Sequence, residues 1–156
     1  MNGIIGNTTP PWNTQSEYVK FTPEGGIAIK LLNDTGAISI KGTVVHASLS
    51  IDNGVSIIPV DNPDPIGIVY DDGIPDGEYI WVVTQGKAEV LYSTTVTRGT
   101  FSRCPQAGDA SPVAGQAINE ALPAPPFATN KHFLEIGHPI ESIGAPGLAL
   151  TMLHFN

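Results

Sequence analysis

Turn-forming residues interrupt this chain at short intervals, and they constrain its fold more than any other feature. The 156 residues include 17 glycines and 14 prolines, which disfavour long helices and are typical of turns. Between them lie short runs rich in β-branched and aromatic residues. No run shows an apolar repeat of 3.6 residues over three helical turns. This pattern predicts an all-β protein, a compact antiparallel barrel or sandwich.

Runs of strand-forming residues can be placed along most of the chain. Asn53-Gly54 separates two of them and predicts a hairpin, because both residues tolerate positive φ angles. Gln85-Gly86 separates two others and predicts a second hairpin. The expected strands are residues 17–21, 27–32, 37–41, 43–51, 55–60, 66–70, 79–84, 87–93, 99–104, 132–138 and 148–155.

Residues 1–15 are expected to form an N-terminal arm ahead of a single β domain at residues 16–156. The sequence Thr-Thr-Pro-Pro-Trp favours an extended, polyproline-like backbone. A frayed terminus would also account for this segment, but apolar side chains are wasteful in a tail that touches nothing. The arm residues expected to contact a neighbouring subunit are Ile4, Ile5, Pro10, Pro11 and Trp12.

Residues 105–130 differ in composition from the strands around them. They are rich in alanine, proline and glycine, and a loop this long in a compact domain tends to be functional or disordered. Residues 114–122 are the one helical candidate, although prolines bound them on both sides. We expect an extended excursion that packs on something outside the barrel. Its candidate subunit contacts are Pro123, Pro125, Pro126 and Phe127.

The charge balance excludes some partners. The net charge is −8, and the seven Lys and Arg residues form no basic stripe, so nucleic acid and an anionic membrane are poor partners. Charged residues make up only 14% of the chain, which suits a surface covered by other protein chains. We expect no secretory signal and no membrane-spanning segment. Cys104 is the single cysteine, so no internal disulfide forms.

The stretch HFLEIGHPIES carries the residues most suggestive of a metal site, His132, Glu135 and His138. On a strand, Glu135 would point away from the two histidines, which would lie about 20 Å apart. On a helix, the spacing of six residues separates the histidines, and Gly137 and Pro139 disfavour that helix. No local metal site is therefore predicted.

The stretch is interpreted as a strand instead. Leu134 and Ile136 are expected to share the face that carries the histidines. A partnership across the fold, for example of His138 with His46 or His154, stays open.

Other candidate sites are equally weak. A run of acidic residues lacks the spacing of a calcium loop and is interpreted as turns. Tyr79 and Trp81 share a strand face and could bind a sugar, but packing in a core or an interface is the commoner use of such a pair. No nucleophile motif, catalytic residue or cofactor site is predicted, and we do not expect an enzyme. The acidic residues are Asp61, Asp64, Asp71, Asp72, Asp76 and Glu78.

Two stretches carry a resemblance to a known family. IGIVYDDGIPDGEYIWVVTQGKAEVLYS (66–93), and the ending HFLEIGHPIES with GLALTMLHFN (147–156), resemble capsid decoration (cement) proteins, small head structural proteins of tailed bacteriophages. About half of the chain is involved, and the matched residues are mainly strand and turn residues. No functional residue carries over from the family.

The resemblance implies a β-rich structural virion protein that is added to the outside of the expanded head, often as a homotrimer. Its partners would be the major capsid protein and copies of itself. It would be made in the host cytoplasm and reside on the capsid surface. One alternative is a receptor- or carbohydrate-binding module of a phage head or tail fibre. The other is an enzyme whose histidines are brought together by folding.

Overall fold

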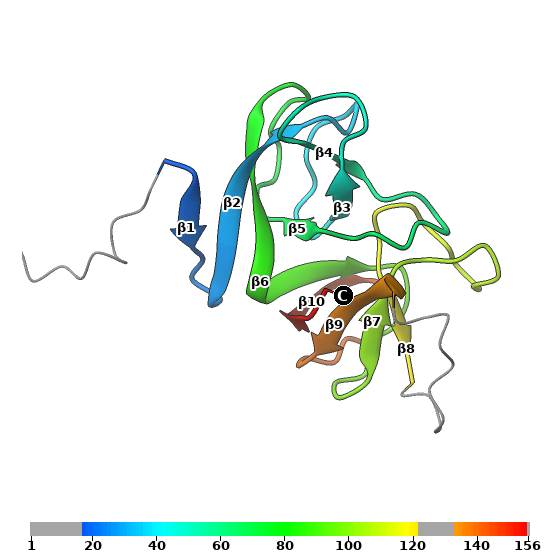
Figure 1. The fold of residues 1–156 in the computed structure, drawn as a ribbon. Coiled ribbons are helices and arrows are strands. Elements are labelled where there is room, and N and C mark those ends of the chain that lie inside the picture. Colours follow the sequence, from blue (N-terminus) through cyan, green and yellow to red (C-terminus); the bar gives the residue numbers. More distant parts are fainter. Residues whose placement is uncertain (1–16, 122–132, 156) are drawn as a thin grey trace, which may run out of the picture.

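The structure, a computed structural model, describes residues 17–121 and 133–155 (Figure 1). They form an all-β fold, which confirms the fold class expected from the turn pattern. The candidate contacts of the arm and of the proline-rich loop lie outside the described residues. The strands are β1 (Val19–Phe21), β2 (Gly26–Asn33), β3 (Val44–Ala47), β4 (Gly54–Ile57), β5 (Gly67–Val69), β6 (Tyr79–Tyr92), β7 (Phe101–Arg103), β8 (Ile118–Glu120), β9 (Glu135–Pro139) and β10 (Gly147–Leu153).

Five strands close into a ring, which makes this part of the molecule a small barrel. Around the ring, β2 pairs with β4, β4 with β3, β3 with β5, β5 with β6, and β6 returns to β2. The β2–β4 pairing is parallel, and the other pairings of the ring are antiparallel. Every strand of the ring contributes to one apolar cluster, which contains Leu31, Val45, Val55, Val69, Ile80 and Val82.

The remaining sheet continues from the second half of β6 through β10, β9, β7 and β8. These strands lie below the ring in Figure 1. A second apolar cluster joins them to the ring, because it includes Ile68 of β5, Val90 of β6, Ile136 of β9 and Ala149 of β10. The packing between the two parts therefore resembles a sandwich, whereas the ring itself is a barrel.

β6 is one continuous bent strand, so the hairpin expected at Gln85-Gly86 is wrong. Its first half pairs with β2, and its second half, from Gly86 to Tyr92, pairs with β10. Gly86 has a φ angle of +80°, and a Cβ there would lie 2.5 Å from the carbonyl oxygen of Gly25. Gly86 allows a sharp bend in β6, at a point where another backbone approaches closely. In the sequence, a glycine at such a bend looks the same as a glycine in a turn.

Two other segments can be compared with the turns and strands expected from the sequence. The antiparallel pairing expected on the two sides of Asn53-Gly54 is confirmed for β3 and β4, but the connection spans residues 48–53, and of the two residues only Asn53 has a positive φ angle, 56°. Residues 37–41 are not a strand. The hydroxyl of Ser39 donates to the carbonyl of Asp71 and accepts from the amide of Ile74, so these residues pair with a loop.

The helical candidate at residues 114–122 contains strand β8 instead. Ala117 and Ile118 are buried, and the amide of Ala117 donates to the carbonyl of Leu91. Within the described part of the excursion, Ala117 and the residues of β8 thus pack on the body of the protein, whereas residues 110–114 are exposed. A contact of the excursion with something outside the barrel stays a prediction. Residues 114–121 contain few apolar residues, but they still form strand β8 because β7 pairs with it.

Candidate functional site

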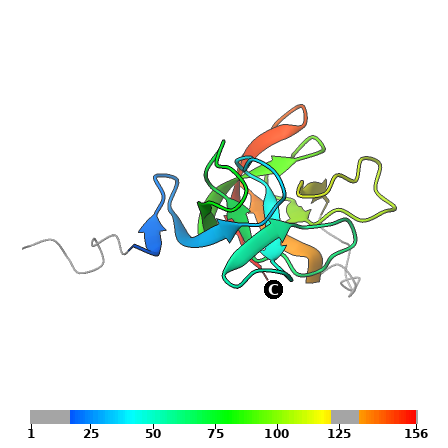
Figure 2. The same ribbon diagram turned by 90° about the horizontal axis from the view of Figure 1, so that it is seen from above.

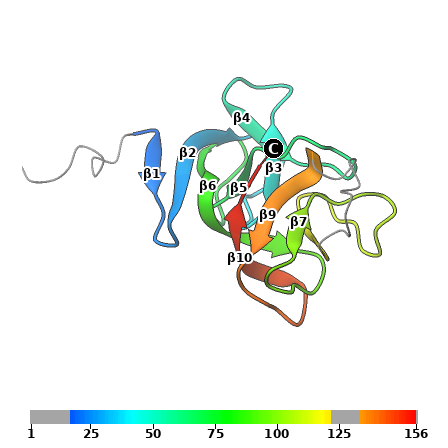
Figure 3. The same ribbon diagram turned by 60° about the horizontal axis from the view of Figure 1, so that its bottom comes forward.

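The β1–β2 hairpin forms one side of the molecule. β1 is the first strand in the sheet order and lies outermost in all three views (Figures 1, 2 and 3). Val19 pairs with Ile29 and Phe21 pairs with Ile27. The side chains of Val19 and Phe21 are 40% and 57% exposed. Large apolar side chains on an edge strand are a feature that soluble proteins normally avoid, and they mark a contact surface.

A shallow hollow adjoins this hairpin, where β2 passes from its partner β1 to its partner β4. Its volume is about 320 Å³. Tyr79 at the start of β6 contributes an exposed ring to it. The residues that line the hollow are Tyr18, Val19, Ile29, Lys30, Leu31, Asn53 and Tyr79. A mainly apolar hollow beside an apolar edge can receive a side chain of another protein.

The aromatic residues beside the hairpin are covered by lysines. The ammonium group of Lys20 lies 4.4 Å from the ring centre of Tyr70 and 4.6 Å from that of Trp81, within cation–π range. Trp81 is partly buried against the core, whereas Tyr79 is exposed. A sugar could stack on Trp81 only after displacing Lys20.

A second site lies at the β9–β10 pair, where Glu135, His138 and His154 converge. One ligand atom from each residue lies within 4.8 Å of the others. The Glu135 carboxylate is 3.3 Å from Nε2 of His138 and 3.5 Å from Nδ1 of His154. The carboxylate is buried, while both histidines are exposed. The cluster joins β9 to the residue that follows β10.

The expectation that Glu135 points away from His138 is therefore wrong. The pairing of β9 with β7 changes register between Ser102 and Arg103, so β9 carries one extra residue there. Gly137 has a φ angle of +150° at this irregularity. An extra residue breaks the alternation of side chains, so residues three apart can share a face. For the same reason Ile136 is buried and does not share the exposed face of His138.

The possible partnership of His138 with His154 is thus observed, and its two ring centres lie 6.4 Å apart. Among the described residues His46 is not part of this cluster, and His132 lies outside the described residues. Gly137 was the available signal, since an isolated glycine within a strand pattern indicates a bulge or a close backbone approach.

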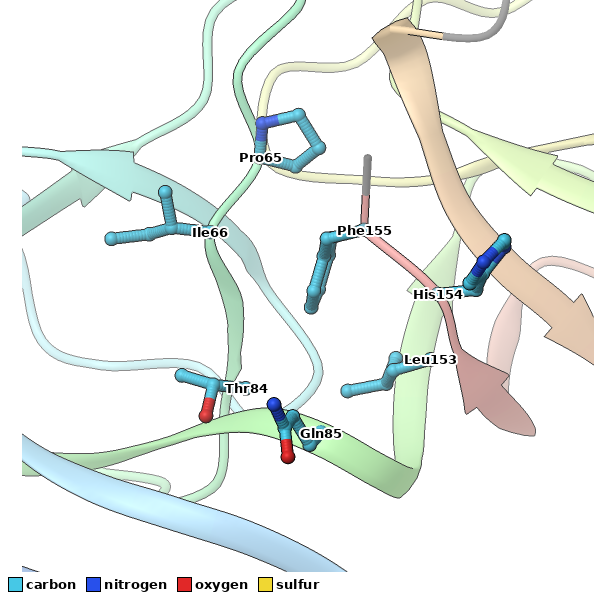
Figure 4. Close-up of a pocket in the computed structure, with 7 residues that line it drawn as sticks. All are labelled: Pro65, Ile66, Thr84, Gln85, Leu153, His154 and Phe155. Atoms are coloured by element: carbon cyan, nitrogen blue, oxygen red, sulfur yellow. The ribbon is translucent and has the colours of Figure 1, made fainter.

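A pocket lies beside the cluster, between β6 and the end of the chain (Figure 4). Its volume is about 530 Å³. Figure 4 shows the ring of Phe155 within the pocket, whereas the ring of His154 lies beside β9. The pocket and the cluster therefore share a residue but open in different directions. The lining residues are Pro65, Ile66, Thr84, Gln85, Leu153, His154 and Phe155.

Three acidic residues of the turns accept hydrogen bonds from backbone amides elsewhere in the fold. Asp71 accepts from the amide of Trp81, Asp72 from that of Lys41, and Asp76 from that of Gly36. Among the described residues they belong to no metal-like group.

Two buried polar residues also have structural roles. Burial raises the pKa of the Cys104 thiol to about 12, so this thiol is unreactive in the folded protein. Arg103 is buried and donates to Asp109 at 2.9 Å and to Glu120. Burial opposes the charge of Arg103, but these hydrogen bonds raise its pKa overall. The ion pair holds the loop after β7 onto β8.

No protein-family model matches the chain, and no curated protein has significant sequence similarity to it. Among residues 17–121 and 133–155, no helix has the length and apolar character needed to cross a membrane.

Proposed function

We propose that this protein is a structural component of a tailed-phage virion, which decorates and stabilises the capsid by binding the major capsid protein and copies of itself. The observation that carries this proposal is the exposed apolar edge of the β1–β2 hairpin with its adjoining hollow. An attachment surface needs anchor side chains that leave water on binding, and Val19, Phe21 and Tyr79 have this character.

Low charge and repeated copies fit the same proposal. Interface cores are depleted in charged residues, and this chain has 14% of them. Many copies attached to one lattice act together, so a weak contact per copy gives strong net attachment. Preferential binding to the expanded head would stabilise that state by linkage. Residues 66–93 and the chain ending resemble decoration proteins, and this resemblance is the reason for proposing a phage capsid as the assembly.

The test is a double substitution, Val19→Asp with Phe21→Asp, assayed by co-sedimentation with expanded heads built from the major capsid protein. Burying two carboxylates in an apolar contact is costly, so attachment should weaken by roughly 30-fold or more, the scale of a hot-spot residue. Circular dichroism would establish that the variant is folded.

Ile140→Asp is the matched control, because Ile140 is 46% exposed but lies after β9, away from the hairpin. This control should attach like the unmodified protein. Equal attachment by the hairpin variant, or equal loss in the control, would contradict the hairpin as the attachment surface.

The alternative, a receptor- or carbohydrate-binding module, would use the exposed ring of Tyr79. The lysines over Tyr70 and Trp81 weigh against it, because a stacked sugar needs an open ring face. Glycan binding that disappears in Tyr79→Ala would favour this alternative over decoration.

A further inference from the structure

Two distances from Glu135, to His138 and to His154, match those between ligands of one metal ion, and the ligand atoms of all three residues lie within 4.8 Å of one another. Two ligands that each lie about 2.0–2.1 Å from a tetrahedral zinc ion are about 3.3–3.4 Å from each other. The Glu135 carboxylate oxygen lies 3.3 Å from Nε2 of His138 and 3.5 Å from Nδ1 of His154. The side chains would need to move little to bind an ion.

The protonation of His138 leads to the same inference. Its Nδ1 lies 3.0 Å from the carbonyl oxygen of Thr100, which can only accept, so Nδ1 carries a hydrogen. In a neutral ring Nε2 then has a lone pair that faces the Glu135 carboxylate oxygen. Two such atoms repel unless a proton or a metal ion lies between them. A metal ion between them would accept this lone pair, and Nδ1 of His154 lies 3.5 Å from the same carboxylate oxygen.

The Thr100 carbonyl also has the role that outer partners have in metal sites. A metal-binding histidine commonly donates its other ring N–H to a carbonyl or carboxylate, which fixes the ring and its tautomer. A backbone hydrogen bond also fixes the strands around the site. The amide of His154 donates to the carbonyl of Ile136 at 2.8 Å, so the ends of β9 and β10 are joined directly beside the ligands.

The donor set indicates the class of ion. Two imidazoles and one carboxylate suit zinc and similar divalent transition metals, whereas magnesium and calcium prefer oxygen donors. Both histidine side chains are about half exposed, at 47% and 60%, which leaves an entry path and room for a water as fourth ligand.

We propose that Glu135, His138 and His154 form a binding site for one divalent transition-metal ion of the zinc class. The ion would link β9 to the residue after β10 and so fasten the end of the chain to the sheet. This site is independent of capsid attachment, and either proposal can hold without the other.

The experiment is calorimetric titration of Zn²⁺ into the full chain, made without a histidine tag and freed of metal with a chelator. The unmodified protein should bind one ion per chain and melt at a higher temperature with zinc present. His154→Gln and Glu135→Gln should each weaken binding by at least about 100-fold, since even outer partners of ligands are worth roughly 10–100-fold. Glu135→Gln keeps the shape of a buried side chain. His154 is exposed, so at least His154→Gln should fold.

His46→Gln is the matched control, because it removes a histidine from β3 that is not in the cluster. This control should bind zinc like the unmodified protein. Absence of binding at micromolar zinc would overturn the proposal. Equal weakening by His46→Gln and His154→Gln would also overturn it, because the uptake would then not depend on this cluster.

Discussion

The β1–β2 hairpin and the β9–β10 pair are two regions of one sheet with opposite chemistry. The hairpin exposes Val19 and Phe21 and pairs with the rest of the sheet along β2 alone among the described strands. The β9–β10 pair is tied to its surroundings by several strands and gathers a buried carboxylate and two histidines. A projecting apolar strand is suited to contact another protein, whereas an anchored polar cluster is suited to hold a small ligand in fixed geometry.

Substitution of Gly137 by alanine should cause the largest loss of stability. The structural change should be confined to the β9–β10 pair. A Cβ at this position would lie 2.0 Å from the carbonyl oxygen of Met152, and the φ angle of +150° disfavours any side chain. We expect a loss of about 3 kcal/mol in the free energy of unfolding, together with loss of zinc binding. Urea denaturation and zinc titration would measure both.

Gly73→Ala is the control for backbone strain alone. Gly73 has a φ angle of +80° but no atom within 4 Å of the added Cβ, so it should cost about 1 kcal/mol and leave zinc binding unchanged. A Gly137 variant no less stable than this control would show that β9 and β10 do not need their close approach.

The next effect concerns the buried Tyr92, which ties three strands together in the second region. Its hydroxyl bonds to Ser102 of β7 and, at 2.7 Å, to Thr151 of β10. Tyr92→Phe leaves both buried hydroxyls short of a partner, so we expect a loss of about 1–3 kcal/mol. Amide hydrogen exchange should quicken in β7 and β10 and stay unchanged in β1 and β2.

Tyr79→Phe is the matched change near the hairpin, where the ring is exposed, and it should alter stability by less than about 0.5 kcal/mol. If the exchange rates of β1 and β2 rose as much as those of β10 in Tyr92→Phe, the two regions would not differ in anchoring.

The smallest effect depends on pH and on Cys104, whose amide donates to the carbonyl of Leu134 just before β9. Its pKa in the folded protein is about 12, raised by burial from 9.0. The unfolded chain loses this proton first as pH rises, so stability is fully present below pH 9 and falls between pH 9 and 12. By pH 10 the loss should reach about 1 kcal/mol, since one pKa unit corresponds to about 1.4 kcal/mol.

Cys104→Ala should lack this part of the pH dependence in urea unfolding between pH 8 and 10, while Tyr92, also raised in pKa by burial, titrates equally in both proteins. Identical slopes for the two proteins would mean that the thiol is accessible in the folded state. Alkylation of Cys104 in the native protein would then be fast.

The sequence predicted what depends on local chemistry. Turn residues such as Asn53-Gly54 act within four residues, so the all-β class and the β3–β4 hairpin could be predicted. The role of Gly86 could not, because a bend inside a strand and a hairpin turn use the same residue, and the choice depends on the strands that lie beside it.

The cluster of Glu135, His138 and His154 depends on two features that a single sequence shows poorly. The extra residue in β9 changes which side chains share a face, and His154 arrives from a strand pairing of long range. Strict alternation placed Glu135 and His138 on opposite faces. The glycine between them was the one local indication of the irregularity.

The central claim, that this protein decorates a capsid, is tested most directly by counting its copies in purified virus particles from the source of the sequence. Quantitative mass spectrometry against the major capsid protein gives the ratio. We predict about one copy per capsid subunit. Absence of the chain from the particles would contradict the account, and a few copies per particle would assign it to a tail or fibre instead.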